Sequence, residues 1–354
     1  MPDLPAFAPF DHEMTPKERI FAALRYERPD QTPRFEIWID GLLRELGQND
    51  PQMAYVNLGQ DCVMMPSTTP QGSNAWNDGV DEWGRIWRNG VYAGGMIETE
   101  ADLRRYSPAQ DYAEQFFDIN RITEVRNNHP DHCLIFGTHI GPFTAGFMAM
   151  GFERFFLCLA NEPTLARKLL KARTDWCIAL YRQAVSLGAE ILVLGDDAAH
   201  NAGPMISPDM WREFVLPCHS RIVDTLAVPI IWHSDGDIQP LLPMAVEAGF
   251  AGVHGLEPAA GIDLGEVKRE FGSDLVLVGN VDVTVLCGSD LEAVRNEVTR
   301  CLELGAPGGG YMIATCNSIF KGMNPASVAE LFRCESELIS GGGSGPYLDT
   351  GGSQ

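Results

Sequence analysis

Residues 186–197, SLGAEILVLGDD, contain in succession a helix end, a glycine, a buried strand and two acids, and this pattern indicates the fold class. Gly188 stands where a helix ends in the left-handed conformation that glycine adopts without strain. Glu190–Gly195 then reads as a nearly continuous apolar run, which is typical of a parallel strand covered on both faces. The stretch predicts one αβ unit of a parallel sheet.

The same pattern occurs twice more. EAGFAGVHGLEP at 247–258 has Gly249 at the expected helix end, and ELGAPGGGYMIATC at 303–316 has Gly305 there. Three αβ units in series imply parallel strands joined by right-handed helical crossovers.

Over the whole chain, we expect eight strands alternating with helices. They are Arg34–Ile39, Asp61–Met65, Cys133–Gly137, Glu190–Gly195, Val228–His233, Phe250–Gly255, Leu275–Gly279 and Gly310–Thr315. Eight strands in this alternation favour an α/β fold of the (β/α)8 TIM-barrel type over a doubly wound sheet. The chain has no GxGxxG after a strand and no GxxxxGK[ST], so no phosphate-binding loop is predicted.

An N-terminal helical extension is expected before the barrel. Thr15, Pro16 and Glu18 have the spacing of a capping box with proline at the first helical position. The predicted organisation is a helical extension over 1–32, the barrel over 33–339 and a flexible Gly/Ser-rich tail over 340–354.

Composition narrows the class of protein. The 354 residues are 45% hydrophobic and 21% charged, which is enough apolar surface for a large core. The net charge of -22 argues against nucleic acid or an anionic membrane surface as partner.

The first residues lack the basic and apolar regions of a secretory signal. No uncharged apolar stretch reaches membrane-spanning length, and the nine cysteines contain no CxxC pair. We therefore expect a cytoplasmic protein with reduced thiols.

Polar side chains follow nearly every predicted strand. In a (β/α)8 barrel the carboxyl ends of the strands form the active site, so these side chains are the candidate functional residues. They are Asp40, Thr138, His139, Asp196, Asp197, His200, Asn201, His233, Asp235, Asp237, Glu257, Asn280, Asp282, Cys316 and Asn317.

His233 and Cys316 are the sharpest pair among them. An imidazole, a thiolate and one or two carboxylates form a tetrahedral zinc set with one position left for substrate. Asp235, in the same loop as His233, is the first carboxylate candidate; Asp196 and Glu257 are the others. A plainer interpretation stays open, because buried histidines and cysteines are common in cores. Two adjacent acids also occur as a helix cap and a solvated charge.

Several segments resemble the uroporphyrinogen decarboxylase superfamily, and more closely its branch of corrinoid-linked methyltransferases. They lie between Met14 and Leu338 and include TPKERIFAALRYERPDQTP at 15–33, VDEWGRIW at 80–87, LVLGDDAAHNAGPMISPDMWREFVLP at 192–217, IIWHSDGDI at 230–238, HGLEPAAGIDLGEVKREFG at 254–272 and GGGYMIATCNSI at 308–319. The resemblance implies a (β/α)8 barrel, in agreement with the strand count.

The methyltransferase branch holds zinc by a His-x-Cys motif and a distant cysteine. His233 matches the histidine and Cys316 the distant cysteine, whereas Asp235 stands where that pattern has cysteine. A carboxylate in place of a thiolate makes the site harder and the metal more Lewis acidic. Such a metal suits pulling on the oxygen of a methyl ether.

The resemblance implies a metal-dependent methyltransferase. It would move a methyl group between a small O-methylated substrate, such as a methoxylated aromatic, and the cobalt of a corrinoid (cobalamin). The chain has no corrinoid-binding DxHxxG, so a partner protein would carry that cofactor. The expected partners are thus a small-molecule methyl donor and a corrinoid protein, with a second copy of this chain as a further candidate.

Roles follow for the remaining candidates. Asp196, Asp197 and Glu257 would complete the metal shell or protonate the leaving oxygen, with His139 as a fourth catalytic candidate. His139 and His200 would support the ligands, and the predicted cofactor-binding residues are His200, Asn280 and Asn317.

Two other classes stay open. One is a decarboxylase-like lyase that uses Asp40, Asp196 and His233 without metal. True decarboxylases have an arginine-rich segment after the first strand, whereas this chain reads RFEIWIDGLLREL there, so electrostatics disfavours a porphyrinogen with four carboxylates. The other class is a non-catalytic barrel that binds a small ligand or a corrinoid protein.

Overall fold

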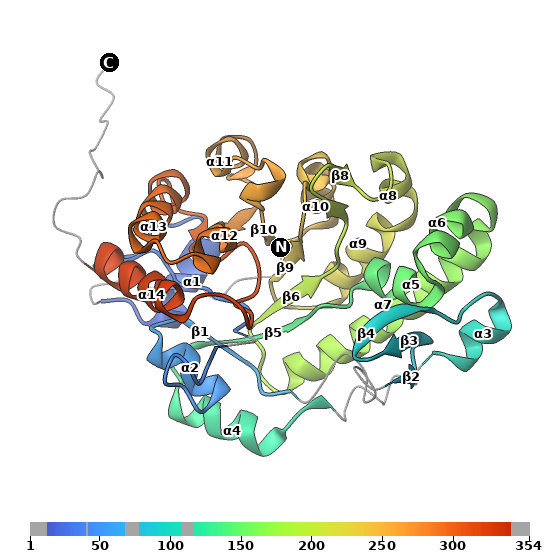
Figure 1. Cartoon of the computed structure of the whole chain (residues 1–354), viewed down its shortest axis with the longest axis horizontal. Coiled ribbons are helices and arrows are strands. Elements are labelled where there is room, and N and C mark those ends of the chain that lie inside the picture. Colours follow the sequence, from blue (N-terminus) through green and yellow to red (C-terminus); the bar gives the residue numbers. More distant parts are fainter. Residues whose placement is uncertain (1–12, 40–41, 68–77, 108–115, 341–354) are drawn as a thin grey trace. The chain divides into compact units, whose positions relative to one another are not determined.

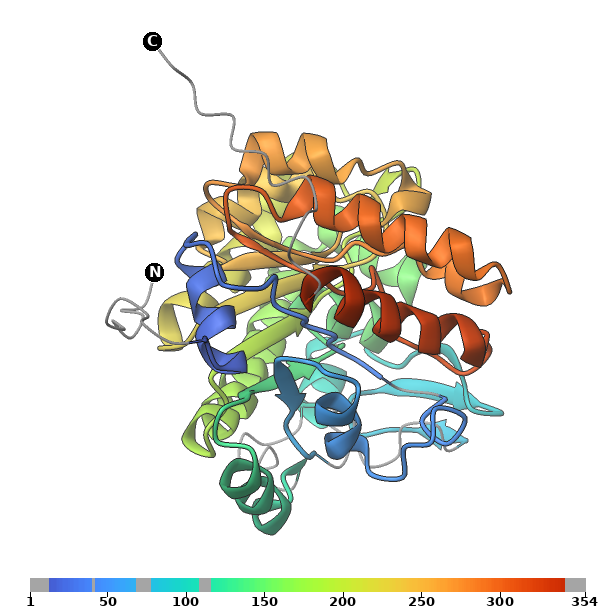
Figure 2. The ribbon, with the colours of Figure 1, turned by 90° about the vertical axis from the view of Figure 1, so that its left-hand side faces the viewer.

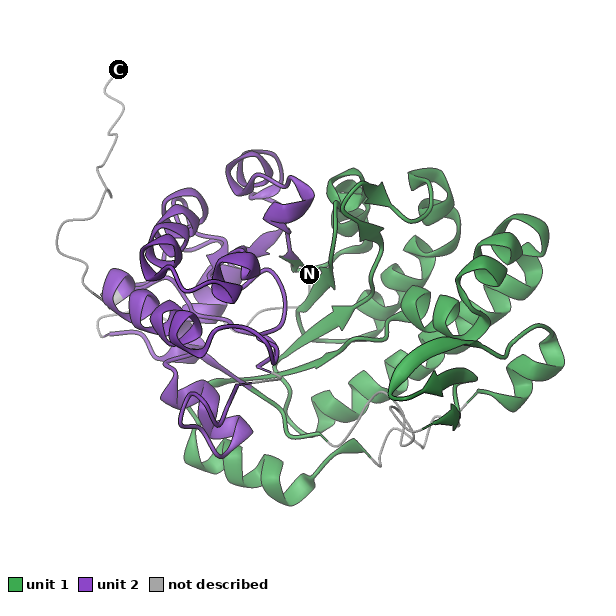
Figure 3. Cartoon of the chain, in the orientation of Figure 1, with its two compact units in different colours: residues 1–3, 64–254 green, residues 4–63, 255–354 purple. Residues whose placement is uncertain are grey.

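The computed structural model describes residues 13–39, 42–67, 78–107 and 116–340. The chain divides into two compact units (Figure 3): unit 1 comprises residues 1–3 and 64–254, and unit 2 comprises residues 4–63 and 255–354. The divisions fall at the end of β1 (Cys62–Met64) and of β10 (Gly252–Gly255).

Unit 1 is built on parallel strands that follow one another in space as they do in sequence (Figure 1). The order is β5-β6-β9, and the register pairs Gly137 with Val193 and Gly195 with His233. Its other parallel-sheet segments are Met64 of β1, beside β5, and residues 252–254 of β10, beside β9. The elements lying wholly in unit 1 are β2 (Gly79–Val80), β3 (Arg85–Arg88), β4 (Val91–Gly95), α3 (Glu100–Arg105), α4 (Ile119–Asn128), β5 (Cys133–Thr138), α5 (Pro142–Met150), α6 (Phe152–Asn161), α7 (Pro163–Ser186), β6 (Ile191–Gly195), β7 (Ala199–His200), β8 (Gly203–Pro204), α8 (Pro208–Phe214), α9 (Leu216–Thr225), β9 (Ile230–Ser234), η2 (Gln239–Leu241) and α10 (Leu242–Ala248).

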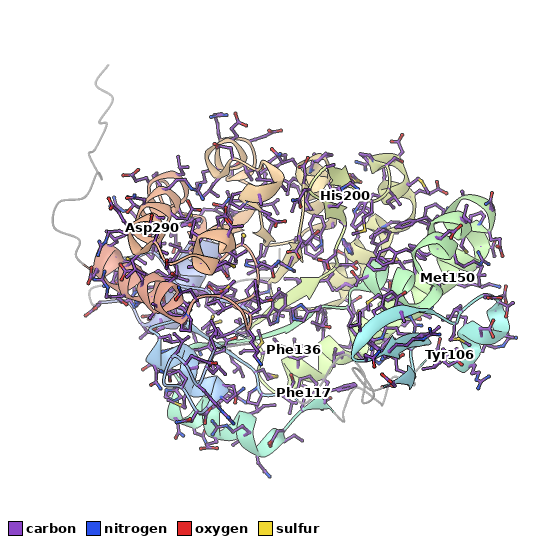
Figure 4. The ribbon with its side chains drawn as sticks, viewed as in Figure 1. Tyr106, Phe117, Phe136, Met150, His200 and Asp290 are labelled. Atoms are coloured by element: carbon purple, nitrogen blue, oxygen red, sulfur yellow. The ribbon has the colours of Figure 1, made fainter. Side chains whose placement is uncertain are left out.

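The core of unit 1 lies between these strands and their helices. Every residue of β5, β6 and β9 is buried, as parallel strands covered on both faces require. On β5, Phe136 packs against Phe117 with ring centroids 5.1 Å apart (Figure 4).

Unit 2 contains the remaining strands. β11 (Val276–Val278) pairs in parallel with β12 (Tyr311–Met312). Next to β12 runs an extended segment that bridges Arg34 to Ile313 and Ile39 to Ile319, both in parallel. The helices of unit 2 are α1 (Pro16–Leu24), α2 (Pro51–Asn57), η3 (Pro258–Ala260), α11 (Leu264–Phe271), α12 (Val283–Cys287), α13 (Leu291–Gly305) and α14 (Pro325–Ser340).

Helices α13 and α14 pack side by side in both ribbon views (Figures 1 and 2), and α1 packs on β12. Helix α1 begins with the predicted capping box. The Thr15 hydroxyl accepts from the backbone N–H of Glu18, and the Glu18 carboxylate accepts from the backbone N–H of Thr15. Both interactions satisfy N–H groups that a helix start leaves without partners.

The alternation of strands and helices confirms the α/β prediction of a (β/α)8 TIM barrel with an N-terminal helical extension. Seven of the eight predicted strands are present. The first, Arg34–Ile39, is extended but joins its neighbour only through the two isolated bridges described above. Those bridges lie in the order that a barrel requires.

One predicted helix end is wrong. Gly188 and Gly249 follow their helices with positive φ angles of 107° and 85°, as expected. Gly305 is instead the last residue of α13, with Ala306 as the C-cap, and it is not among the glycines with a positive φ angle. Glycine is needed there for space, because a Cβ would lie 2.4 Å from the ring of Tyr311.

The remaining expectations concern Asp40 and the tail, membrane-spanning helices, and the domain boundaries and location. Asp40 lies outside the described residues, as does the predicted tail apart from Ser340 at the end of α14. Among the described helices, no single one is long and apolar enough to cross a membrane; α5 and α6 meet that test only as a pair bent by 108°. The predicted domain boundaries and cytoplasmic location stay predictions.

Candidate functional site

The carboxyl ends of β5, β6 and β9 bring the unit 1 candidates together. Backbone approach is close here: a Cβ on Gly195 would lie 2.6 Å from the carbonyl oxygen of Thr138, so the last residue of β6 must be glycine. The next two residues, Asp196 and Asp197, therefore leave the sheet beside the ends of both neighbouring strands.

Asp196 is fully buried, and its carboxylate serves the start of helix α5. It accepts hydrogen bonds from the backbone N–H groups of Phe143 (3.2 Å) and Thr144 (2.7 Å), and its Oδ2 lies 2.8 Å from Nε2 of His219. An anion at a helix start is favoured by the free N–H groups and the helix dipole. Asp196 thus ties β6 to α5 and α9.

Asp197 points its carboxylate toward the neighbouring loop. Its backbone N–H donates to the Thr144 hydroxyl at 2.8 Å, and its Oδ1 lies 3.5 Å from the backbone nitrogen of Asp235. Burial raises the pKa of Asp197 to about 7, with a further contribution from the charge of Asp235. Without a cation beside it, this carboxyl therefore holds its proton to higher pH than an ordinary aspartate.

His233 lies on β9 and is buried within the site. It is 4% exposed, and burial lowers the pKa of its imidazole to about 3. Nearby His139, after β5, has its pKa lowered by burial to about 4. Both rings are therefore neutral near pH 7. A neutral imidazole has one nitrogen lone pair available for a metal ion.

The two nitrogens of His233 face different partners. Nε2 lies 3.5 Å from Oδ1 of Asp235, and Nδ1 lies 2.7 Å from Nδ1 of His254. The two rings are 4.8 Å apart between centroids, with an interplanar angle of 36°. His254 is fully buried on β10.

Asp197, His233 and Asp235 form a candidate metal-ligand group, since one donor atom from each lies within 4.8 Å of the others. One imidazole nitrogen and two carboxylate oxygens fit zinc and other divalent first-row metals. The Asp235 side chain is 40% exposed, so a small molecule has access to this ligand. The donor set thus fits the predicted metal, and it includes Asp197, for which the sequence leaves open a place in the metal shell or a role as proton donor.

The hydrogen bonds of His200 go to residues outside this group. His200 is exposed on β7 (Figure 4), and its Nδ1 accepts from the backbone N–H of Ala202 at 3.2 Å. Its carbonyl accepts from the backbone N–H of Asp237 at 3.1 Å, which fixes the loop after β9 to the β7 turn. A Cβ on Gly236 in that loop would lie 2.7 Å from the backbone of Ala199.

Several other predicted site residues belong to unit 2. Cys316 is fully buried after β12, and its backbone N–H donates to the carbonyl of Val281 at 2.9 Å. Glu257 is half-buried at the start of η3, and Asn317 is half-buried with its side-chain oxygen accepting from the backbone of Ser318 at 2.6 Å. Their predicted roles stay predictions.

Asn280 is held inside unit 2 by its own side-chain contacts. Its Nδ2 donates to the carbonyl of Leu256 at 2.8 Å, and its Oδ1 accepts from Arg300 at 3.0 Å. It is fully buried. Both ends of the Asn280 amide therefore have protein partners. Through them the side chain holds the backbone at Leu256 and the Arg300 side chain in place.

Sequence reasoning missed His254 and the partnership of His219 with Asp196. A usable signal existed for His254, which is a titratable residue inside the apolar run FAGVHG. Buried polar groups require partners, so its position predicts a hydrogen bond across the strands. For His219 the sequence shows only a histidine within α9.

Comparisons with known proteins are consistent with this fold. The family model described as Uroporphyrinogen decarboxylase (URO-D) matches residues 89–338. A methylated-thiol--coenzyme M methyltransferase of Methanosarcina mazei is 28% identical over 53% of this chain and 50% of its own length. The chain thus spans about half of that relative.

A further curated relative and a solved structure are also similar to this chain. A uroporphyrinogen decarboxylase of Saccharophagus degradans is 26% identical over 68% of this chain and 70% of its own. The solved structure of a methyltransferase from Methanosarcina mazei superposes with a TM-score of 0.74 at 22% identity, over 92% of this chain and 99% of that one. This structural likeness shows the fold.

Proposed function

The chain belongs to the uroporphyrinogen decarboxylase family, and we propose that it is a metal-dependent methyltransferase. In this proposal a methyl group moves between a small O-methylated substrate and the cobalt of a corrinoid carried by a partner protein. The relationship to a methyltransferase within the family supports methyl transfer. The observation that carries the proposal is the group formed by Asp197, His233 and Asp235.

These three residues of unit 1 would hold the metal. Bound zinc supplies Lewis acidity toward the ether oxygen of a substrate. Carboxylates donate less electron density than thiolates, so a site with two aspartates favours an oxygen substrate over a thiol. Asp235 in place of the cysteine of the methyltransferase branch thus supports an O-methylated donor.

The chain's own residues have separable tasks. His233 presents a neutral ring, since burial lowers the pKa of its imidazole to about 3. Asp196 holds α5 and the end of β6 in place, because its carboxylate is bonded to two backbone N–H groups and to His219. We assign it a positioning role. The catalytic roles predicted for Glu257 and His139 stay predictions.

A metal-free lyase has less support from the described contacts. That reading needs Asp196 as an acid or base, but its two oxygens are engaged by Phe143, Thr144 and His219 in a fully buried position. A substrate proton has no access to a carboxylate enclosed in this way.

The test is a methyl-transfer assay on the full chain. Zinc-loaded protein is mixed with free cob(I)alamin and a panel of methoxylated benzoates, and the loss of the Co(I) absorbance is followed. We expect transfer with the wild type and with Asp224→Asn, an exposed acid on α9, and only background with His233→Ala. Equal rates in the wild type and His233→Ala would contradict the proposal.

Two other outcomes identify the competing classes. Decarboxylation of a porphyrinogen by metal-free protein would replace the proposal with the lyase. Thermal stabilisation by a methoxylated benzoate, with no turnover in the presence of zinc and cobalamin, would favour the non-catalytic barrel.

A further inference from the structure

The contact between His233 and His254 joins two ring nitrogens, one from β9 and one from β10. Their Nδ1 atoms lie 2.7 Å apart, which is a hydrogen-bond distance. The side chains are 4% and 0% exposed respectively, so bulk water does not separate them.

A contact of this kind contains one proton. Two protonated nitrogens would place two hydrogens between the atoms, and two bare nitrogens would place two lone pairs there. One Nδ1 therefore donates and the other accepts. In a neutral imidazole the second nitrogen then has the opposite character, so the shared proton sets the tautomer of both rings.

The surroundings of His233 decide which ring should donate when a metal is bound. Its Nε2 is the nitrogen near Oδ1 of Asp235, at 3.5 Å. To offer a lone pair at Nε2, His233 must carry its ring proton at Nδ1. That proton needs an acceptor, and Nδ1 of His254 occupies the required place.

We propose that His254 is a positioning residue that holds His233 in the Nδ1–H tautomer and fixes its ring for metal binding through Nε2. The inference rests on the proposed function, because it assumes that His233 is a metal ligand. A hydrogen-bond acceptor behind a ligating histidine fixes the orientation of its ring and raises its basicity. Carboxylates and carbonyl groups usually take this role, and here a second histidine takes it.

The sequence around His254 fits this task. The residue is flanked by Val253, which is also fully buried, and by Gly255, with a positive φ angle of 106°. Neighbouring residues of a strand point to opposite faces. Val253→Ala therefore disturbs the same strand from its other face and serves as the matched control.

The experiment measures zinc affinity of the full chain by competition with a chromogenic chelator. His254→Leu removes the acceptor, whereas His254→Asn keeps an acceptor oxygen on Cγ, where Nδ1 is attached in histidine. We expect a zinc affinity about 10- to 100-fold weaker for His254→Leu. We expect His254→Asn to stay within about threefold of the wild type, and Val253→Ala to lose stability while keeping its affinity.

The outcomes separate this inference from the proposed function. Wild-type affinity in His254→Leu, or an equally large loss in His254→Asn, would overturn the role of His254. Wild-type affinity in His233→Ala would overturn the metal site itself, and with it both proposals.

A second measurement needs no variant. In zinc-loaded wild type with 15N-labelled histidine rings, the nitrogen chemical shifts should show His233 protonated at Nδ1. A proton at Nε2 of His233 would contradict the inference.

Discussion

Nε2 of His219 lies 2.8 Å from Oδ2 of Asp196, and both side chains are buried in unit 1. The pair is enclosed by aromatic rings, with Trp211, Trp232 and Phe250 each 5.2 to 5.9 Å from the His219 ring between centroids. Asp196 is adjacent in sequence to Asp197. Asp196 thus stabilises the fold, while Asp197 belongs to the candidate metal-ligand group.

Asp196→Asn tests this division of labour. The amide nitrogen replaces an acceptor that now meets backbone N–H groups or His219, so a buried polar group loses its partner. We expect a loss of about 1–3 kcal/mol in the free energy of unfolding, measured with urea, and unchanged zinc per folded chain. The exposed Asp224→Asn should stay within about 0.5 kcal/mol. Unchanged stability together with lost zinc would instead make Asp196 a ligand.

Gly141→Ala tests the packing that holds Asp196. A Cβ at this position would lie 2.3 Å from Cγ of Asp196, so α5 or the carboxylate must shift. We expect a destabilisation of about 1–3 kcal/mol. Gly288→Ala is the control, because its φ angle is -83° and the nearest atom to an added Cβ is 3.7 Å away. Equal melting temperatures for both variants would refute the close contact.

Glu335→Gln tests a buried carboxyl cluster in unit 2. Burial raises the pKa of Glu36 to about 7, and burial together with the charge of Glu36 raises the pKa of Glu335 to about 8. Gln60 connects them, accepting from the backbone of Glu36 at 2.9 Å and donating to Glu335 at 3.5 Å. Carboxyls with raised pKa values bind more protons in the folded state than in the unfolded state.

The sign of the pH effect follows. The contribution of these two groups to stability is fully present below about pH 4.3, the unfolded pKa of glutamate. It declines as pH rises toward the folded pKa values of about 7 and 8. The glutamine introduced by Glu335→Gln cannot ionise, so the variant should gain at least about 1.4 kcal/mol relative to the wild type between pH 5 and pH 8. Parallel stability–pH curves from urea unfolding would show that Glu335 does not titrate in this range.

Asp235→Cys tests whether the carboxylate of residue 235 sets the preference of the candidate group for harder metal ions. The change restores the His-x-Cys spacing of the methyltransferase branch and replaces a carboxylate by a thiolate. The ratio of zinc to manganese affinity should rise by at least about tenfold, and methyl transfer from an ether should slow. An unchanged ratio in competition titrations would mean that residue 235 is not a ligand.

The sequence predicted the strands and their ends for a clear physical reason. Strands such as Ile191–Gly195 are buried on both faces, so their apolar runs are nearly continuous, and most polar residues appear at or just after the end of the strand. The pattern therefore predicts that Asp197, His233 and Asp235 lie at one edge of the sheet.

The sequence does not predict which side chains contact one another. The sequence alone does not distinguish the roles of two adjacent aspartates. The position of α5 shows that the Asp196 carboxylate, and not that of Asp197, accepts hydrogen bonds from the backbone of Phe143 and Thr144. The pairing of His254 with His233 depends on two strands 21 residues apart in sequence. Gly305 matches the pattern of a glycine that follows a helix, but it is the last residue of α13 and leaves room for the ring of Tyr311.

The most direct test of the metal site is zinc content by elemental mass spectrometry on chain purified without chelator and offered zinc. We predict about one zinc per chain in the wild type and in Asp224→Asn, and loss of zinc in His233→Ala and Asp197→Ala. Wild-type protein without zinc, or His233→Ala with the wild-type amount, would contradict a metal centre at Asp197, His233 and Asp235.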